Sequence, residues 1–264
     1  MKRLTLLAAA ALGVGFTHNV LAADLGVRAA PAYVAPAVVA PTWTGVYLGF
    51  NGGWGWTNSN NTNLGFTSPG GAFIPFTVAT GNNNADSPVF GGQVGYNYQI
   101  GGWVLGVEGD VDGANIQANQ NVFIPAGGGF VGGSGFLNER QTWLASIRGR
   151  VGYTWGPGMI YVTGGGAWTG IEATGGATLL SGETGTFTAN STQSGYVAGA
   201  GYEWMIAPNW SLRGEYLYYG FTNSLNSGAV LFPVAGASLA GNLNKFNTSV
   251  VRIGLDYKFD WWPH

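Results

Sequence analysis

The stretch "VVRIGLDYKF" occupies residues 250–259, close to the end of a 264-residue chain. Every odd position from 251 to 259 is apolar or aromatic, and the charges lie at even positions: Arg252, Asp256 and Lys258. Successive side chains of a β-strand point to opposite faces of a sheet, so the segment predicts a strand with one apolar and one charged face. Which of these faces meets water decides the fold.

The composition narrows the answer. Only 8% of the residues are charged, whereas a soluble domain carries about 25%, so charged side chains cannot cover an ordinary water-facing surface. Glycine is abundant at 47 residues, and 14% of the residues are aromatic. After the N-terminus no apolar run approaches the ~20 residues of a membrane-spanning helix. The chain is therefore predicted to be either a buried all-β core or a β-barrel in lipid.

The N-terminus has the pattern of a secretory signal peptide. Lys2 and Arg3 precede the apolar stretch "LTLLAAAALGVGF", and "NVLAADL" supplies small residues for cleavage after Ala22 or Ala23, which makes residues 1–22 the signal. Removing Lys2 and Arg3 changes the formal charge from −2 to −4, which gives no footprint for nucleic acid. With no cysteine, disulfides cannot hold the exported protein together.

The rest of the chain divides into a tether, a barrel and a tail. Residues 23–42 are rich in Ala and Pro and predict an extended periplasmic tether. Residues 43–259 hold eight alternating segments, and residues 260–264 form a tail. Short and long connections alternate between the segments, as in outer-membrane barrels with short periplasmic turns and long extracellular loops. The eight predicted strands are 45–56, 89–100, 103–113, 142–155, 159–170, 194–205, 210–220 and 246–259.

The charges of these segments all lie on one face. Eleven residues make up this set, which we expect to line the lumen: Glu108, Asp110, Asp112, Arg148, Arg150, Glu203, Arg213, Glu215, Arg252, Asp256 and Lys258. A soluble, lipocalin-like barrel would instead place the apolar face inside, around a ligand. Aromatic residues at both strand ends favour lipid outside, because they form interface belts there. The predicted belt residues are Trp54, Trp56, Trp103, Trp143, Trp155, Trp168, Trp204, Trp210, Tyr257 and Phe259.

An interior lined by charges is expected to neutralise itself, since an unpaired buried charge is costly. The strand heights predict Glu108 beside Arg148 and Arg150, Glu203 opposite Arg213, and Glu215 beside Arg252. Such a network predicts a largely plugged lumen, because eight strands leave room only for side chains. The alternative is a narrow pore whose charge rings select small hydrophilic solutes.

The sequence offers no chemistry for an enzyme. Its two histidines are His18, in the predicted signal, and His264, the last residue, so no barrel histidine can serve as a base or metal ligand. The acids of residues 108–112 could hold a cation, but the nearby arginines favour salt bridges. We expect no catalytic residue, no cofactor and no metal.

Several motifs together resemble the small outer-membrane proteins of alphaproteobacteria, the 25- and 31-kilodalton surface-antigen family of porin-family or OmpA-like barrels. The resemblance rests on "WTGVYLGFNGGWGW" (43–56), "GGQVGYNYQIGGWVLGVEGDVDG" (91–113), "SIRGRVGYTW" (146–155), "IYVTGGGAW" (160–168), "GYEWMIAPNWSLRGEYLYYGF" (201–221) and "VRIGLDYKF" (251–259). It implies an eight-stranded antiparallel up-and-down barrel in the outer membrane. Members are described as structural surface proteins, some porin-like and some haem-binding, and no catalytic residue carries over.

The chain departs from that family at its end. Family members usually stop at the terminal aromatic residue that the insertion machinery reads, whereas Asp260–His264 follow Phe259 here. We expect Tyr257–Phe259 to be the effective signal and the tail to lie at the periplasmic side. The predicted function is an integral outer-membrane surface protein with a structural or envelope-integrity role. Its predicted partners are membrane lipid and the insertion machinery, without nucleic acid, and a monomer is expected rather than an oligomer.

Overall fold

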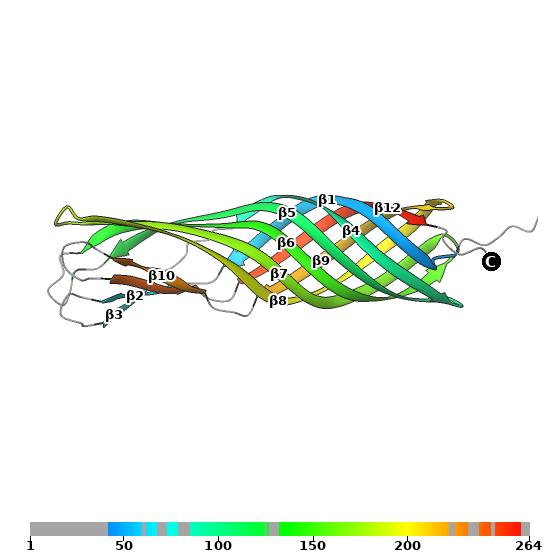
Figure 1. Ribbon diagram of the computed structural model, residues 1–264, viewed down its shortest axis with the longest axis horizontal. Coiled ribbons are helices and arrows are strands. Elements are labelled where there is room, and N and C mark those ends of the chain that lie inside the picture. Colours follow the sequence, from blue (N-terminus) through cyan, green and yellow to red (C-terminus); the bar gives the residue numbers. More distant parts are fainter. Residues whose placement is uncertain are drawn as a thin grey trace, which may run out of the picture. The chain divides into compact units, whose positions relative to one another are not determined.

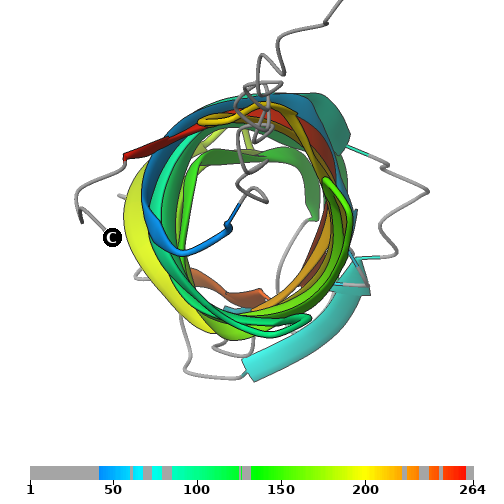
Figure 2. The same cartoon turned by 90° about the vertical axis from the view of Figure 1, so that its right-hand side faces the viewer.

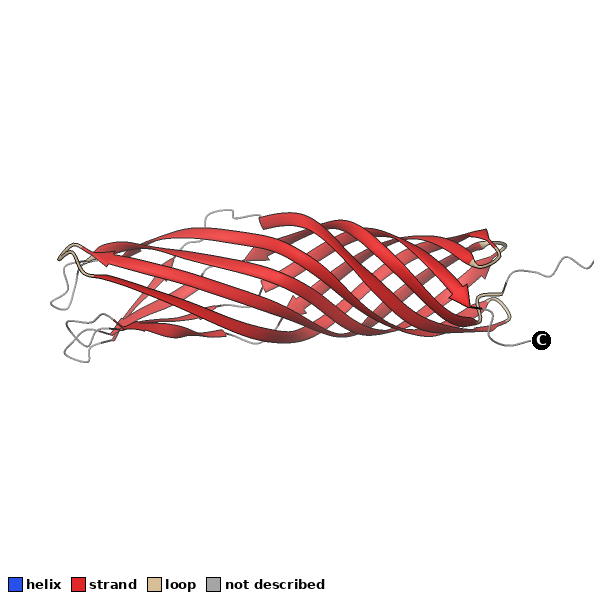
Figure 3. Ribbon diagram, turned by 45° about the horizontal axis from the view of Figure 1, so that its top comes forward, coloured by secondary structure: helices blue, strands red, loops and turns tan. Residues whose placement is uncertain are grey.

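The computed structural model describes residues 42–59, 62–67, 73–78, 85–124, 126, 132–221, 225–231, 238–243 and 246–259. The predicted signal peptide, the tail and all of the tether except Thr42 lie outside the described residues. Strands and the turns between them account for the regular structure (Figure 3). Among the described residues there is no helix of the length and apolarity that a membrane crossing requires.

Eight antiparallel strands form a closed barrel (Figures 1 and 2). Each strand pairs with its neighbour along the chain, and the ring closes where β1 pairs with both β4 and β12. Closure removes the free strand edges over the length at which all eight strands pair. Beyond that level the extensions of β5 and β8 each pair with one neighbour, β6 and β7 respectively. The strands are β1 (Gly45–Ser59), β4 (Ala85–Ile100), β5 (Trp103–Ile124), β6 (Gly133–Trp155), β7 (Gly158–Leu179), β8 (Thr184–Ala207), β9 (Trp210–Phe221) and β12 (Phe246–Phe259).

The tight connections all lie at one end of the barrel. Two residues join β4 to β5, β6 to β7 and β8 to β9. At the first of these turns Gly101 has a φ of 60°, a conformation that glycine adopts without steric cost. The start of β1 and the end of β12 pair with each other at this same end. An even number of strands therefore returns the chain to the side on which it entered.

The two longest connections contain short strands of their own. These are β2 (Thr62–Thr67) and β3 (Phe73–Val78) between β1 and β4, and β10 (Leu225–Leu231) and β11 (Ser238–Leu243) between β9 and β12. They form a four-stranded sheet in the order β10-β11-β2-β3. The sequence predicts only loops here. Pairing of the two connections satisfies backbone hydrogen bonds that an irregular loop would leave to water.

The other two long connections are largely strand as well, which corrects the predicted boundaries. Residues 114–124 and 133–141 continue β5 and β6, and residues 171–179 and 184–193 continue β7 and β8. The four strands therefore run well past the lengths of about ten residues that a membrane needs. Their Gly-, Asn- and Thr-rich sequence resembles a loop because no lipid requires apolar side chains on them.

The outward face of the barrel is apolar between two aromatic belts. Phe50, Val107, Ile147 and Ile253 are exposed by 60–73%, although nothing polar surrounds them. On β6 the belts are marked by Trp143 and Trp155, twelve positions apart. At about 3.3 Å per residue and a tilt of about 40°, this separation is roughly 30 Å, the thickness of a bilayer's hydrocarbon core.

Beyond the outer belt the two faces exchange character. Buried apolar residues face inward there, among them Ile116, Leu137, Ile171 and Ala173. Exposed polar residues face outward, among them Asn115, Gln117, Asn119, Arg140 and Glu172. Charged side chains inside and apolar ones outside suit lipid, whereas the reverse arrangement suits water. The exchange marks the level at which the barrel leaves the membrane.

Candidate functional site: the barrel lumen

The middle of the lumen is a layer of buried charges. Arg148, Arg150, Arg213 and Arg252 enter it from β6, β9 and β12 and are 1–3% exposed. The acids come from every second position of β5, from β8, β9 and β12: Glu108, Asp110, Asp112, Glu203, Glu215 and Asp256. All ten of these side chains belong to the set predicted to line the lumen. These side chains lie together because each residue occupies a position of its strand that points into the lumen.

Arg148 and Arg252 join the acids of several strands. Arg148 is ion-paired with Glu108, with Asp110 at 3.0 Å and with Glu215 at 3.2 Å. Arg252 contacts Glu215 and Asp112, each at 2.6 Å, and Asp110 at 3.3 Å. Each guanidinium therefore bridges strands that are not neighbours in the ring, which ties opposite walls of the barrel together.

The other two arginines form the inner half of the layer. Arg150 contacts Glu203 at 2.6 Å. Arg213 contacts Asp256 at 2.9 Å and is also paired with Glu108. The sequence placed Glu203 opposite Arg213, and the two are register partners, but the carboxylate of Glu203 reaches Arg150 instead. The length of the side chains decides which arginine the Glu203 carboxylate contacts. The position of a residue along its strand does not describe that length.

Two tyrosines belong to the charge layer although they are not among the residues predicted to line the lumen. The Tyr47 hydroxyl donates to Glu108 at 2.5 Å and accepts from Arg150 at 3.1 Å. The Tyr161 hydroxyl donates to Glu215 at 3.1 Å, and the Arg150 guanidinium lies 4.1 Å from the centre of its ring. Both are at inward positions, so the parity of β1 and β7, applied to uncharged residues, would have identified them.

The inner end of the lumen is closed by an apolar cluster. Trp43, only 3% exposed, packs against Val104, Met159 and Tyr161. Its backbone N–H donates to Gln99 Oε1 at 2.8 Å. The chain then leaves the lumen at Gly45, whose φ of 146° only glycine adopts readily. Figure 2 shows the beginning of β1 turning into the ring.

Lys258 lies at the rim rather than in the charge layer. It is half-buried, and its Nζ donates to the carbonyl of Thr42 at 2.6 Å. The residue therefore fastens the segment that carries Trp43 to the last strand. Lys258 is only one residue from the end of β12, which places it at the edge of the set predicted to line the lumen.

A third layer covers the charges on the outer side. It is made of tightly packed, fully buried side chains from β6 to β9 and β12. The cluster comprises Leu144, Ala167, Val197, Leu217, Tyr219, Phe221 and Val250. The charge layer thus lies between two apolar layers, which keeps water from its ion pairs and strengthens them.

The predicted belt residues lie on the outward face. Trp103, Trp155, Trp204, Trp210 and Phe259 are exposed near the tight turns, where Tyr257 is half-buried. Ring contacts link them to one another and to nearby tyrosines, for example Trp210 with Tyr257 at 5.0 Å between centroids. At the other end, Trp54 and Trp168 are exposed and Trp56 and Trp143 are half-buried.

The chain is similar to several known outer-membrane proteins. The 31 kDa outer-membrane immunogenic protein of Brucella melitensis biotype 1 is 32% identical over 268 residues, covering 98% of this chain and all of that protein. The 25 kDa outer-membrane immunogenic protein of Brucella canis is 29% identical over 261 residues, with 98% and 99% covered. The solved structure of OprG from Pseudomonas aeruginosa is 11% identical with a TM-score of 0.42, covering 82% of this chain and 97% of that one.

The family match extends over nearly the whole chain. Residues 20–259 match the family described as the outer membrane protein beta-barrel domain. The matched region contains all eight strands of the ring and both aromatic belts. The chain therefore belongs to the outer membrane protein beta-barrel family, and it is an integral protein of the outer membrane.

Proposed function

We propose that this protein has a structural role in the outer membrane, as a barrel whose lumen is closed to solutes. The observation that supports the proposal is the sequence of three layers across the lumen: the Trp43 cluster, the charge layer and the Leu144–Phe221 cluster. A water-filled channel would leave its lining charges hydrated, whereas the four arginines of the charge layer are buried.

Conductance across planar lipid bilayers tests the proposal. Purified, monomeric native protein is expected to give no steady conductance. Arg148→Glu or Arg150→Glu places a seventh acid among six and is expected to open the charge layer and produce a leak. The matched control is Arg140→Glu, which changes a charge on the outward, exposed face. Steady conductance of the native protein, with a selectivity that Arg148→Glu alters, would establish the narrow pore instead.

The soluble, ligand-binding alternative is ruled out by the orientation of the faces. It requires the apolar face of the membrane-height strands to be inside, but that face is outside. Membership of an outer-membrane family agrees with this orientation. The two named relatives are outer-membrane immunogenic proteins, and their names indicate no enzyme. We accordingly infer a non-catalytic surface protein whose extended strands β5–β8 face the outside of the cell.

We propose two partners, membrane lipid and the insertion machinery, from the residues at the inner end of the barrel. Lipid contacts the belts, and the insertion machinery reads β12 through Tyr257–Phe259. We propose that the barrel acts as a monomer, because its ring of eight strands is closed where it crosses the membrane. Deleting residues 260–264 tests the signal, and assembly into the heat-modifiable folded form is expected to continue. Loss of assembly in the deletion, but not after Pro263→Ala, would place the signal in the tail.

A further inference from the structure

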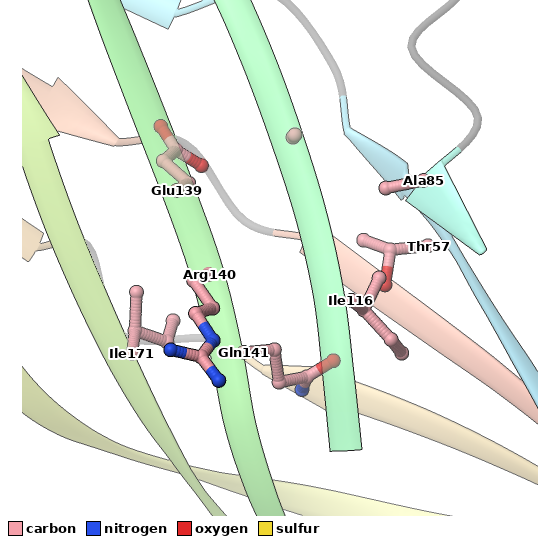
Figure 4. Close-up of a pocket in the computed structure, with 8 residues that line it drawn as sticks. Thr57, Ala85, Ile116, Glu139, Arg140, Gln141 and Ile171 are labelled. Atoms are coloured by element: carbon pink, nitrogen blue, oxygen red, sulfur yellow. The ribbon is translucent and has the colours of Figure 1, made fainter. Parts of the chain in front are cut away.

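A small cavity lies inside the outer end of the barrel, beyond the Leu144–Phe221 cluster. Its volume is about 40 Å³. Thr57, Ile116, Glu139, Gln141 and Ile171 line it, from four different strands (Figure 4). The isoleucines form apolar walls, and Glu139 is the acid that faces the cavity. This is the part of the barrel that water reaches, not lipid.

A bulge in β6 aims Glu139 into this cavity. In the ladder to β7, Thr142 is an extra residue between Gln141 and Trp143. In the ladder to β5 the register shifts at the same level, where two residues of β5, Ala114 and Asn115, lie opposite Thr142. On the inner side of Thr142 the even positions of β6 face the lumen, and on the outer side the odd positions do. Bulges re-aim side chains in this way, often next to functional sites. A regular strand would have turned Arg140 inward and Glu139 outward.

The bulge also separates the acid from its nearest base. Arg140 contributes to the cavity wall, but its side chain is half exposed on the outer face. There its guanidinium donates to Asn115 at 2.7 Å and pairs with Glu172 at 3.8 Å. The register partners of Glu139 are Ala118 and Ala173, which offer no side-chain donor. Glu139 is therefore left without a counter-charge from the adjacent strands.

Hydrogen-bonding capacity beside the cavity is unmet. Oε1 of Glu139 is buried and has no hydrogen-bond partner. Gln120, the next inward residue of β5 after Ala118, is 5% exposed, and neither its amide oxygen nor its amide nitrogen has a partner. Buried polar groups are rarely left in this state unless water, an ion or a ligand completes them. Burial also raises the pKa of the Glu139 carboxyl to about 7.

The floor of the cavity, in contrast, is satisfied. Thr57 and Thr248 share a hydrogen bond of 3.0 Å, and Thr248 donates to Gln141 at 3.3 Å. The Gln141 amide then donates to Thr169 at 2.9 Å. A ligand in the cavity therefore finds an unmet acceptor at Glu139 and meets only apolar or already bonded groups elsewhere in the lining. At about 10–15 Å³ for each water-sized atom, the cavity holds roughly three to four of them.

We propose that this cavity binds the ammonium group of a short primary alkylamine, with Glu139 as its counter-ion. An ammonium group donates hydrogen bonds and accepts none, which matches the unmet acceptor of the Glu139 carboxylate. A short alkyl chain fits between Ile116 and Ile171. The site is independent of whether the lumen deeper in the barrel conducts.

Calorimetric titration of the folded protein in detergent micelles tests the proposal at pH 8, where Glu139 is ionised. The probes are propylammonium chloride, 1-propanol as its neutral analogue, and sodium chloride to hold the ionic strength constant. Propylammonium is expected to bind saturably and 1-propanol is not. Glu139→Gln is expected to weaken binding at least about tenfold, since a charged hydrogen bond is lost.

Glu172→Gln is the matched control, because Glu172 is an acid of the adjacent strand on the outward face. Its affinity for propylammonium is expected to equal that of the native protein. Heat-modifiable migration on gels verifies that both variants are folded. Equal affinities of Glu139→Gln and Glu172→Gln would overturn the proposal, as would binding of 1-propanol as tight as that of propylammonium.

Discussion

At the scale of single residues, an ion pair between arginine and a carboxylate affects stability differently on the exposed surface and in the buried lumen. Arg140 and Glu172 meet at 3.8 Å with both side chains half exposed, and such pairs contribute about 0–1 kcal/mol. Arg148 is fully enclosed by Glu108, Asp110 and Glu215. Desolvation makes each buried charge depend on its partners, so the loss of one leaves the others uncompensated.

The first prediction compares these two arginines. Arg148→Met is expected to lower the free energy of unfolding by about 3–5 kcal/mol, because three buried carboxylates lose their shared cation. Arg140→Met should change it by no more than about 1 kcal/mol. Urea unfolding of the refolded barrel, followed by tryptophan fluorescence, measures both. Equal effects of the two substitutions would mean that the charge layer does not hold the barrel together.

The second prediction concerns Glu139 and pH. Its pKa is about 7 in the folded protein, above its ordinary value of 4.5, so the folded state keeps a proton that the unfolded state has released. Stability therefore falls as pH rises from about 4.5 to 7. Glu139→Gln is expected to stabilise the barrel by roughly 1–3 kcal/mol at pH 8 and to have little effect at pH 4.5. Urea unfolding at both pH values, without added amine, measures the difference.

At the scale of the element, β6 is one strand with two environments. From Trp155 to Trp143 it places Arg148 and Arg150 inside and apolar side chains outside. From Gln141 to Gly133 it places Leu137 inside and Arg140, Asn138 and Ser134 outside. The bulge at Thr142 lies at the junction of the two parts. The hydrogen-bond ladder continues along β6 while the inward-facing positions change from even to odd. One strand can therefore have one part in lipid and the other in water.

The third prediction tests that change of parity. The chain has no cysteine, so single cysteines can be introduced and labelled from outside with a bulky, membrane-impermeant maleimide. Arg140→Cys is expected to react quickly and Glu139→Cys slowly. Deleting Thr142 joins the outward Trp143 directly to the inward Gln141, so regular alternation is expected to keep this order. A reversed order in the native background or in the deletion would show that Glu139 does not face the lumen.

At the scale of the whole molecule, the lumen is filled by residues distant in sequence. Trp43 precedes the first strand, and Lys258 near the end of the last one holds the carbonyl beside it. The charge layer draws on seven strands of the ring, and the outer cluster on five. Closure of the ring is what places all these groups in one narrow interior.

The fourth prediction separates the layers. Trp43→Ala is expected to lower the free energy of unfolding by about 3–5 kcal/mol, because it leaves a cavity among Val104, Met159 and Tyr161. It is expected to give no conductance in planar bilayers, since the charge layer still blocks the lumen. A steady current through Trp43→Ala alone would show that the inner cluster is the actual barrier.

Inside the membrane, the number of strands and the residues that face inward could be predicted from the sequence. The structure of the barrel outside the membrane could not. Lipid forces apolar side chains outward inside the membrane, so the alternation in residues 250–259 has a physical cause that the sequence displays. Beyond Trp143 water replaces lipid, and residues 114–124 and 133–141 look like a loop although they belong to strands β5 and β6. The ion pair of Glu203 with Arg150 was missed for a related reason, since it depends on side-chain reach across the lumen.

The sequence by itself determined an exported, eight-stranded outer-membrane barrel with its charges inside, because the membrane imposes one rule on every strand that crosses it. Only the tertiary structure decided the long strand extensions, the bulge that turns Glu139 inward and the entry of Trp43 into the lumen. These features depend on register and on contacts between distant strands. A shift of one residue at Thr142 leaves no mark in composition or periodicity, yet it exchanges the two faces of everything that precedes it in β6.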